Sequence, residues 1–165
     1  MMLTVQLVAE IIQTVMALKD DQIWIYNQKK PIPNTKGLFV VVGLVDAKPY
    51  AVSKYFNGDT ETRVVHMSEV ISIDLFSSDL TAPTRLAELV GALNSQYCVQ
   101  SQEANGFKLA SIPMAVHNTS ELEGSAILQR FTVTTAVLRA YDNTDLTEYY
   151  ETFSLETFTE EGQVT

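Results

Sequence analysis

The sequence is poor in the features from which a chemical function is usually predicted. Its single cysteine, Cys98, excludes an internal disulfide bond and any metal site built from several cysteines. Its 11 Lys and Arg stand against 20 Asp and Glu, and the resulting net charge of −9 argues against a protein that neutralises many nucleic-acid phosphates. The seven glycines are dispersed, and they form neither G-x-x-x-x-G-K nor G-x-G-x-x-G, the two common phosphate-binding patterns.

Long apolar runs are also missing. The longest, residues 38–45, has eight residues counting Gly43, whereas a membrane-spanning helix needs about 20. We therefore interpret it as a buried strand and expect no membrane contact. The first ten residues carry no basic region and reach an acid at Glu10, so we expect no secretory signal.

The sequence also offers little for catalysis. Its two histidines, His66 and His117, fall on a polar strand face and at a strand end, and no serine stands in a G-x-S-x-G pattern. The carboxylates of Asp20-Asp21 and of Asp142 with Asp145 have no histidine at ligand spacing. We predict no catalytic, cofactor-binding or metal-binding residue, and we interpret Cys98 as a semi-buried structural thiol.

What is present is a pattern for a folded core, since 46% of the 165 residues are apolar. Near the N-terminus, apolar residues recur at helical spacing, which predicts an amphipathic helix. They are Leu3, Leu7, Val8, Ile11, Ile12, Val15 and Leu18. Residues 22–27 then favour a short strand, and residues 29–34, with two prolines, favour a loop.

The next segment predicts two strands around a tight turn. Residues 37–45 are a Val-rich strand that we expect Lys48-Pro49 to break. Asn57-Gly58 is a hairpin signal, because both residue types tolerate positive φ. Residues 61–76 form a long strand whose odd positions are mostly apolar, so its even face should be wet.

Helices and then strands follow. Ser77-Ser78-Asp79 and Pro83 favour a helix start, ahead of an apolar stripe of Leu86, Leu89, Val90 and Leu93. Asn94-Ser95 is expected to cap a further helical segment that ends at Asn105-Gly106, with a hairpin there as the alternative.

Most of the remaining chain is predicted to form strands. Residues 107–116 form a strand with Pro113 at an edge or bulge, and residues 117–123 a polar connection. Residues 124–141 are the longest strand, ended by Asp142-Asn143, and residues 147–153 could add a last short one.

This order predicts an α+β fold, a mainly antiparallel twisted sheet with two or three helices packed on one face. Long strands adjoin without regular strand–helix alternation. We expect a single domain over residues 1–155. Residues 156–165 should be an acidic and flexible tail, since the chain from Asp142 onward has seven acids and no Lys or Arg.

Aromatic residues gather where the predicted surface is. Tyr50, Tyr55 and Phe56 crowd the hairpin tip, and Tyr149, Tyr150, Phe153 and Phe158 crowd the acidic end. Exposed aromatics are enriched where proteins meet proteins, although these side chains could also fold back onto the core. The candidate interface residues are Tyr55, Phe56, Asp59, Arg130, Tyr149 and Tyr150, with Arg130 on the wet face of the longest strand.

The second half resembles the tail terminator or neck proteins of tailed bacteriophages. The resemblance lies in the layout of the segments 70–76, 86–93, 105–107, 109–116, 128–133 and 148–153. The N-terminal helix followed by Gln22-Ile23-Trp24 fits the same layout. The chain departs from the pattern at Ser77-Ser78-Asp79, where relatives often have a glycine.

The resemblance implies a virion subunit without catalysis or cofactor. Such a subunit would form a homo-oligomeric ring, commonly a hexamer, at the head-proximal end of the tail tube. It would bind the tube protein and a neck or head connector protein, and in contractile tails the sheath protein, while DNA passes through the channel without specific binding. Two alternatives are a head-completion or connector subunit, and a small α+β ligand-binding or enzymatic domain with His66 or His117 in a pocket.

Overall fold

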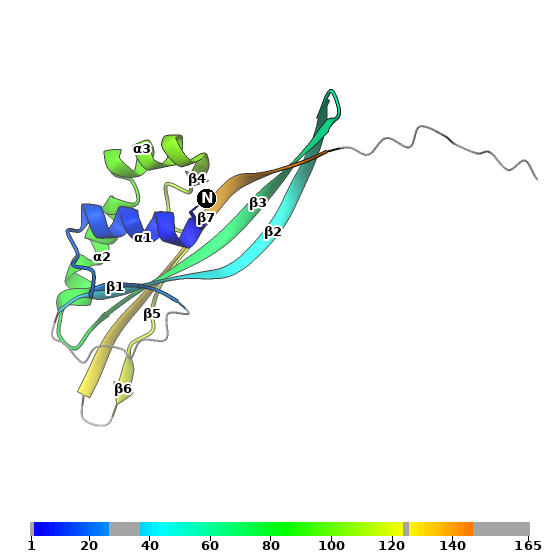
Figure 1. Ribbon diagram of the computed structural model, residues 1–165. Helices are drawn as coiled ribbons and strands as arrows, with labels where there is room; N and C mark the ends of the chain where they lie inside the picture. Colours follow the sequence, from blue (N-terminus) through cyan, green and yellow to red (C-terminus); the bar gives the residue numbers. More distant parts are fainter. Residues whose placement is uncertain (1, 27–36, 124–125, 147–165) are drawn as a thin grey trace, which may run out of the picture.

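A computed structural model describes residues 2–26, 37–123 and 126–146 of the chain. Within these residues it contains three helices and seven strands (Figure 1). In chain order they are α1 (Thr4–Val15), β1 (Ile23–Ile25), β2 (Phe39–Asn57), β3 (Thr60–Ser77), α2 (Thr81–Ala92), α3 (Gln96–Asn105), β4 (Phe107–Leu109), β5 (Ala115–Asn118), β6 (Glu121–Glu123) and β7 (Ala126–Leu146).

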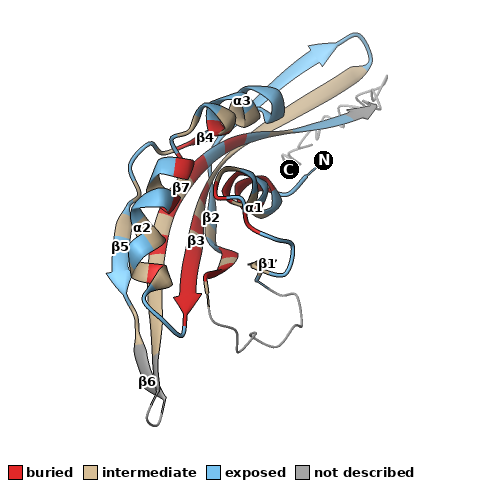
Figure 2. Ribbon diagram, turned by 90° about the vertical axis from the view of Figure 1, so that its left-hand side faces the viewer, coloured by how far each residue is buried: buried red, intermediate tan, exposed pale blue. Residues whose placement is uncertain are grey.

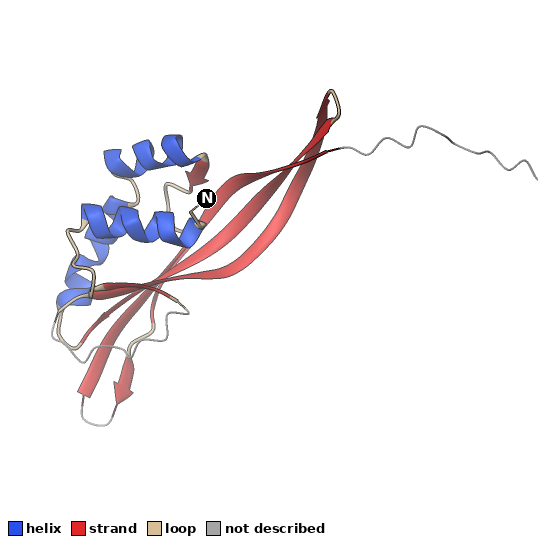
Figure 3. Ribbon diagram, in the orientation of Figure 1, coloured by secondary structure: helices blue, strands red, loops and turns tan. Residues whose placement is uncertain are grey.

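The strands form one curved sheet in the order β1-β2-β3-β7-β4. Both β5 and β6 pair with β7 nearer its N-terminal end than β4 does. The β1–β2 pair is parallel and the other strand pairs are antiparallel. The three described helices lie on one side of the sheet (Figure 3), so the predicted α+β fold is confirmed. None of the described helices is long and apolar enough to cross a membrane.

The core lies between the helices and the middle of the sheet. The predicted N-terminal helix is confirmed as α1, and its stripe residues Leu7, Val8, Ile11 and Ile12 are fully buried. They join a cluster that the sheet completes with Ile71, Ile73, Leu75, Val133 and Val137. The buried residues, red in Figure 2, follow this part of the sheet and the inner faces of the helices.

Three strands continue beyond the helices as a ribbon that we call the arm. The arm consists of residues 47–57 of β2, 60–68 of β3 and 139–146 of β7. Figure 1 shows it projecting away from the part of the molecule that carries the helices, which we call the body. Its central strand, β3, is paired on both sides along its whole length.

The arm corrects two predicted strand ends. Lys48-Pro49 does not break the first strand: β2 runs through it, with register shifts between Leu44 and Asp46 and between Pro49 and Ala51. Proline is tolerated there because β1 pairs only with residues 40–42, which leaves this stretch of β2 at the sheet edge. Asp142-Asn143 does not end the longest strand either, since both residues pair with β3.

The predicted hairpin turn is confirmed, with a difference in detail. Asn57 pairs with Thr60 as the last residue of β2, and Gly58 takes φ +61°. Among the described non-glycine residues only Ala17 has positive φ, so Asn57 remains extended. The turn therefore uses the freedom of the glycine alone.

The helix starts in the second half follow the predicted caps. Asp79 Oδ1 accepts from Thr81 N at 2.9 Å and Ser77 Oγ accepts from Ala82 N at 2.9 Å, which satisfies two free donors of α2. Ser95 Oγ caps α3 by accepting from Cys98 N at 3.1 Å. Gly106 ends α3 with φ +64°, so the alternative of a hairpin at Asn105-Gly106 is wrong.

Three further expectations need correction. The predicted strand 107–116 is two strands, β4 and β5, with Pro113 in the break between them. The predicted connection 117–123 contains the end of β5 and all of β6. The even face of β3 is not wet throughout, since Asp74 and Phe76 are buried near its end. The loop 29–34, the strand 147–153 and the tail 156–165 lie outside the described residues, so the domain boundary at 155 stays a prediction.

Candidate interaction surface

The arm exposes large apolar side chains along its edge strand. Val40 and Val42 of β2 are fully buried in the body, yet every residue from 47 to 57 is exposed. The exposed fractions are 57% for Tyr50, 58% for Val52, 52% for Tyr55 and 60% for Phe56. Figure 2 shows this end of β2 in pale blue. Large apolar side chains exposed together on one strand are typical of a site where proteins meet.

The two candidate residues Tyr55 and Phe56 lie on opposite faces of the arm, because successive side chains of a strand alternate. Phe56 is opposite Glu61 and shares the face of Val52 and Lys54, the face that carries the helices in the body. Tyr55 is opposite Thr62, on the helix-free face. Tyr50 lies against His66, with ring centroids 5.8 Å apart. The aromatic side chains that the sequence predicts as one cluster are thus divided between the two faces of the arm.

Charged residues accompany Phe56 on its face. Glu61 lies between Lys54, at 3.6 Å, and Arg63, at 3.7 Å. Ion pairs near a protein surface add little stability. Asp59, the third predicted tip residue, is exposed in the turn beside Gly58.

A buried polar cluster joins the base of the arm to the start of α1. Tyr141 Oη donates to Glu69 Oε1 at 2.5 Å and lies 3.2 Å from Thr4 Oγ1. Arg139 Nη1 donates to Met2 O at 2.8 Å, and its guanidinium lies 5.1 Å from the Tyr141 ring centroid. Burial, and then the hydrogen bond to Glu69, raise the pKa of Tyr141 above its usual value.

Sequence reasoning missed this cluster, although it left a signal. Glu69 and Arg139 interrupt the apolar positions of two long strands, and the structure buries both. Charged residues are rarely buried unless they are paired. Their positions therefore indicate a polar junction at the base of the arm.

Arg130 belongs to a different place. Its Nη2 lies 3.2 Å from Asp74 Oδ2, and its guanidinium lies over Phe76, 5.0 Å from the ring centroid. Phe39 and Trp24 extend this aromatic cluster. Arg130 pairs with Phe76 at the end of β3 opposite the turn, so the structure does not bring it together with Tyr55 and Phe56. Tyr149 and Tyr150 lie outside the described residues.

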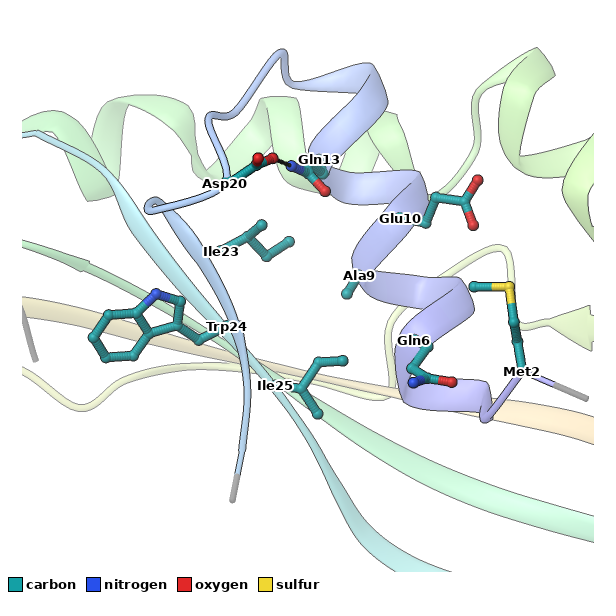
Figure 4. A pocket seen from close by; sticks show the side chains of 9 residues that line it. All are labelled: Met2, Gln6, Ala9, Glu10, Gln13, Asp20, Ile23, Trp24 and Ile25. Carbon is teal, nitrogen blue, oxygen red and sulfur yellow. Dashed lines mark hydrogen bonds between the residues drawn. The ribbon is translucent and has the colours of Figure 1, made fainter. Parts of the chain in front are cut away.

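A cleft of about 310 Å³ lies between α1 and β1 (Figure 4). Its lining includes the apolar residues Ala9, Ile23 and Ile25 and the acids Glu10 and Asp20. Glu10 Oε1 accepts from Tyr97 Oη at 3.0 Å, and Asp20 Oδ1 accepts from Gln13 Nε2 at 2.7 Å. Both hydrogen bonds come from neutral groups, so the cleft carries negative charge.

Neither histidine lies in this cleft, nor in the shallow depression beside the start of α2. His66 is half-buried against Tyr50, and His117 is exposed on β5. Within the described residues, no group of three or more His, Cys, Asp and Glu side chains could hold a metal ion. Cys98 is fully buried rather than semi-buried, and burial raises the pKa of its thiol.

Comparisons with known proteins give a coarse likeness to solved structures. No protein-family model matches the chain. No curated protein matches it either. Among solved structures, the chain is similar to the sheath/tube terminator of an extracellular contractile injection system in its extended state. The two share 14% identity with a TM-score of 0.42, over 99% of this chain and 66% of the other, so this chain spans just under two thirds of that protein's length.

Proposed function

We propose that this chain is a structural subunit of a phage-type tail, a tail terminator that assembles with copies of itself into a ring at the head-proximal end of the tail tube. The observation that carries the proposal is the arm. Residues 47–57 expose Tyr50, Val52, Tyr55 and Phe56 on a ribbon that projects from the body (Figure 1). The order of segments in the sequence, which resembles that of phage tail terminator or neck proteins, points to the same class of protein.

The arm favours assembly for a physical reason. An exposed sheet edge is a template for pairing, and large apolar side chains gain free energy when another surface covers them. The arm and the body present different surfaces, so a contact between them would be head-to-tail. Repeated head-to-tail contacts close into a ring when the rotation permits.

The proposed partners follow from this position. One rim of the ring would contact the tube protein and the other a neck or head connector protein, and in a contractile tail the sheath protein would add a third contact. The net charge of −9 suits a channel through which DNA passes without binding. Under this proposal the assembled protein is found in the virion, and no catalysis or cofactor is involved.

The test uses tail tubes assembled from the tube protein of the same particle. Negative-stain images of tubes mixed with the purified chain should show a ring on one end of each tube. A matched variant with its arm aromatics removed, Tyr55→Ala with Phe56→Ala, should leave most ends bare. Bare tube ends with the unmodified chain would contradict the proposal. A ring that forms on the portal instead would assign the chain to head completion.

A further inference from the structure

The arm and the cleft between α1 and β1 both carry apolar side chains, and the charges beside those side chains are of opposite sign. On its helix-side face the arm presents Phe56 next to the cations Lys54 and Arg63, which flank the acid Glu61, and the cleft presents apolar Ala9, Ile23 and Ile25 next to the acids Glu10 and Asp20. The cleft takes up about 310 Å³, which is large enough for one large side chain and lies at the lower end of the size range of small-molecule sites. In Figure 4, Ile23 and Ile25 lie on the side of β1 that faces α1, with Ala9 across from them.

The outer edge of β1 adds a second reason for a partner at this cleft. Val40 N donates to Gln22 O and Tyr26 N donates to Val42 O, so the backbone groups of alternate residues point to β2. The backbone groups of Ile23 and Ile25 therefore point the other way, to an edge that bears no strand among the described residues. Such an edge accepts a strand from another chain.

The arm cannot reach the cleft of its own chain. It leaves the body away from β1, and its turn lies at the far end of β3 from the Phe39–Phe76 pair that neighbours β1 (Figure 1). An arm in this cleft must therefore come from a second copy.

We propose that the tip of the arm of one copy sits in the α1–β1 cleft of the next copy, with Phe56 over Ala9, Ile23 and Ile25 and with Lys54 beside Glu10. This contact would be the interface of the proposed ring, and in that sense it rests on the proposed function. Charge favours the arm over the other aromatic segment of the chain: residues 147–165 contain five acids and no Lys or Arg, and they would meet Glu10 and Asp20 with like charge.

A charge reversal tests the pairing of Lys54 with Glu10. Lys54→Glu alone and Glu10→Lys alone should each weaken self-association by tenfold or more in sedimentation velocity, because each variant places like charges together. The double variant should recover most of the loss. Lys108→Glu makes the same charge change on exposed β4 and serves as the control. Equal weakening by the control, or no recovery in the double variant, contradicts the pairing.

Cross-linking tests the location of the contact. The one native thiol, Cys98, is buried, so new cysteines can be labelled selectively. Asp59→Cys at the arm turn is mixed with tagged Gln13→Cys at the cleft and treated with a short bis-maleimide, in the presence or absence of tail tubes. The expected product is a crossed dimer, a cross-linked pair that contains one copy of each variant. Asp59→Cys mixed with Ile112→Cys, a position 79% exposed, is the matched control and should not.

The outcomes separate this inference from the proposed function. Tubes capped by a ring that gives no crossed dimer overturn the arm–cleft contact and leave the terminator role standing. A crossed dimer without capped tubes supports the contact and removes the terminator role. If Asp59→Cys gives as much crossed dimer with Ile112→Cys as with Gln13→Cys, the cross-links arise from non-specific collision, and the arm–cleft contact is overturned.

Discussion

Tyr141 is the residue through which the arm, the sheet and the start of α1 are held together. Its hydroxyl contacts Glu69 from the neighbouring strand and Thr4 from the helix. Glu69 is almost fully buried, and a buried carboxylate that loses a donor is costly. The base of the arm is thus tied to the neighbouring strand and to α1 by polar contacts as well as by strand pairing.

Tyr141→Phe should lower the free energy of unfolding at neutral pH by about 1–3 kcal/mol, because it leaves Glu69 without this donor. Chemical denaturation measures the loss. Tyr97→Phe, which removes a similar bond to exposed Glu10, is the control and should have a smaller effect. Equal effects of the two variants would mean that the buried cluster adds nothing beyond a surface bond.

The same variant should change the response to alkaline pH. The folded protein raises the pKa of Tyr141 above the usual value of about 10, so the folded state holds this proton more tightly than the unfolded state. The stabilisation is complete below pH 10 and is lost as the pH rises through the folded pKa. The stability difference between the unmodified chain and Tyr141→Phe should therefore shrink above pH 10. The pKa of Cys98 is also raised, but it is raised in both proteins, so its effect cancels in the stability difference. A constant difference from pH 8 to pH 11 would refute the assignment.

Ser77 has a local role at the start of α2. Its Oγ accepts from Ala82 N and donates to Asp79 O, so Ser77→Ala removes a buried cap. We expect a loss of about 0.5–2 kcal/mol in thermal or chemical unfolding. Ser78→Ala, at the exposed neighbouring position, should be close to neutral. A larger loss from Ser78→Ala would show that the turn is not held by Ser77.

At the scale of elements, substitutions in the arm should affect assembly, and substitutions in the core should affect stability. Tyr55→Ala with Phe56→Ala should impair assembly while leaving the melting temperature near that of the unmodified chain, because both side chains are more than half exposed. Leu89→Ala, which truncates a fully buried residue of α2, should do the reverse and lower stability by about 2–5 kcal/mol. A large drop in melting temperature for the arm variant would place its aromatics in the core.

The elements that could be predicted are those in which one local rule dominates. The α1 stripe is visible because burial of one helix face imposes its period, and the ends of α3 are visible because Ser95 and Gly106 have local cap roles. Pro49 misled the prediction of β2 because the rule against proline assumes a strand with partners on both sides.

The cluster at Tyr141 is the kind of feature that a single sequence conceals. Its members Thr4, Glu69 and Tyr141 are separated by more than 60 residues, so no local pattern connects them. The tip of the hairpin could be located from Asn57-Gly58, yet the division of Tyr55 and Phe56 between two faces required the register of β2 against β3.

At the scale of the whole molecule, one strand belongs to two environments. In the body, β3 carries the fully buried Ile71, Ile73 and Leu75, which belong to a core cluster to which all three described helices contribute. In the arm, beyond the Tyr141 cluster at its base, the same strand has partners on both sides but no described helix packed on either face. Local opening is easiest where few apolar contacts must be broken.

Hydrogen exchange should therefore divide β3 along its length. Backbone amides of residues 71–75 should exchange only on global unfolding, and those of residues 60–66 should exchange at least tenfold faster although they too are hydrogen-bonded. When copies assemble, the arm amides should slow far more than the body amides, because a second surface then covers them. Uniform protection along β3 in the dissociated chain would mean that the arm unfolds only with the body. Protection confined to the body on assembly would mean that the arm is not what the copies use to bind one another.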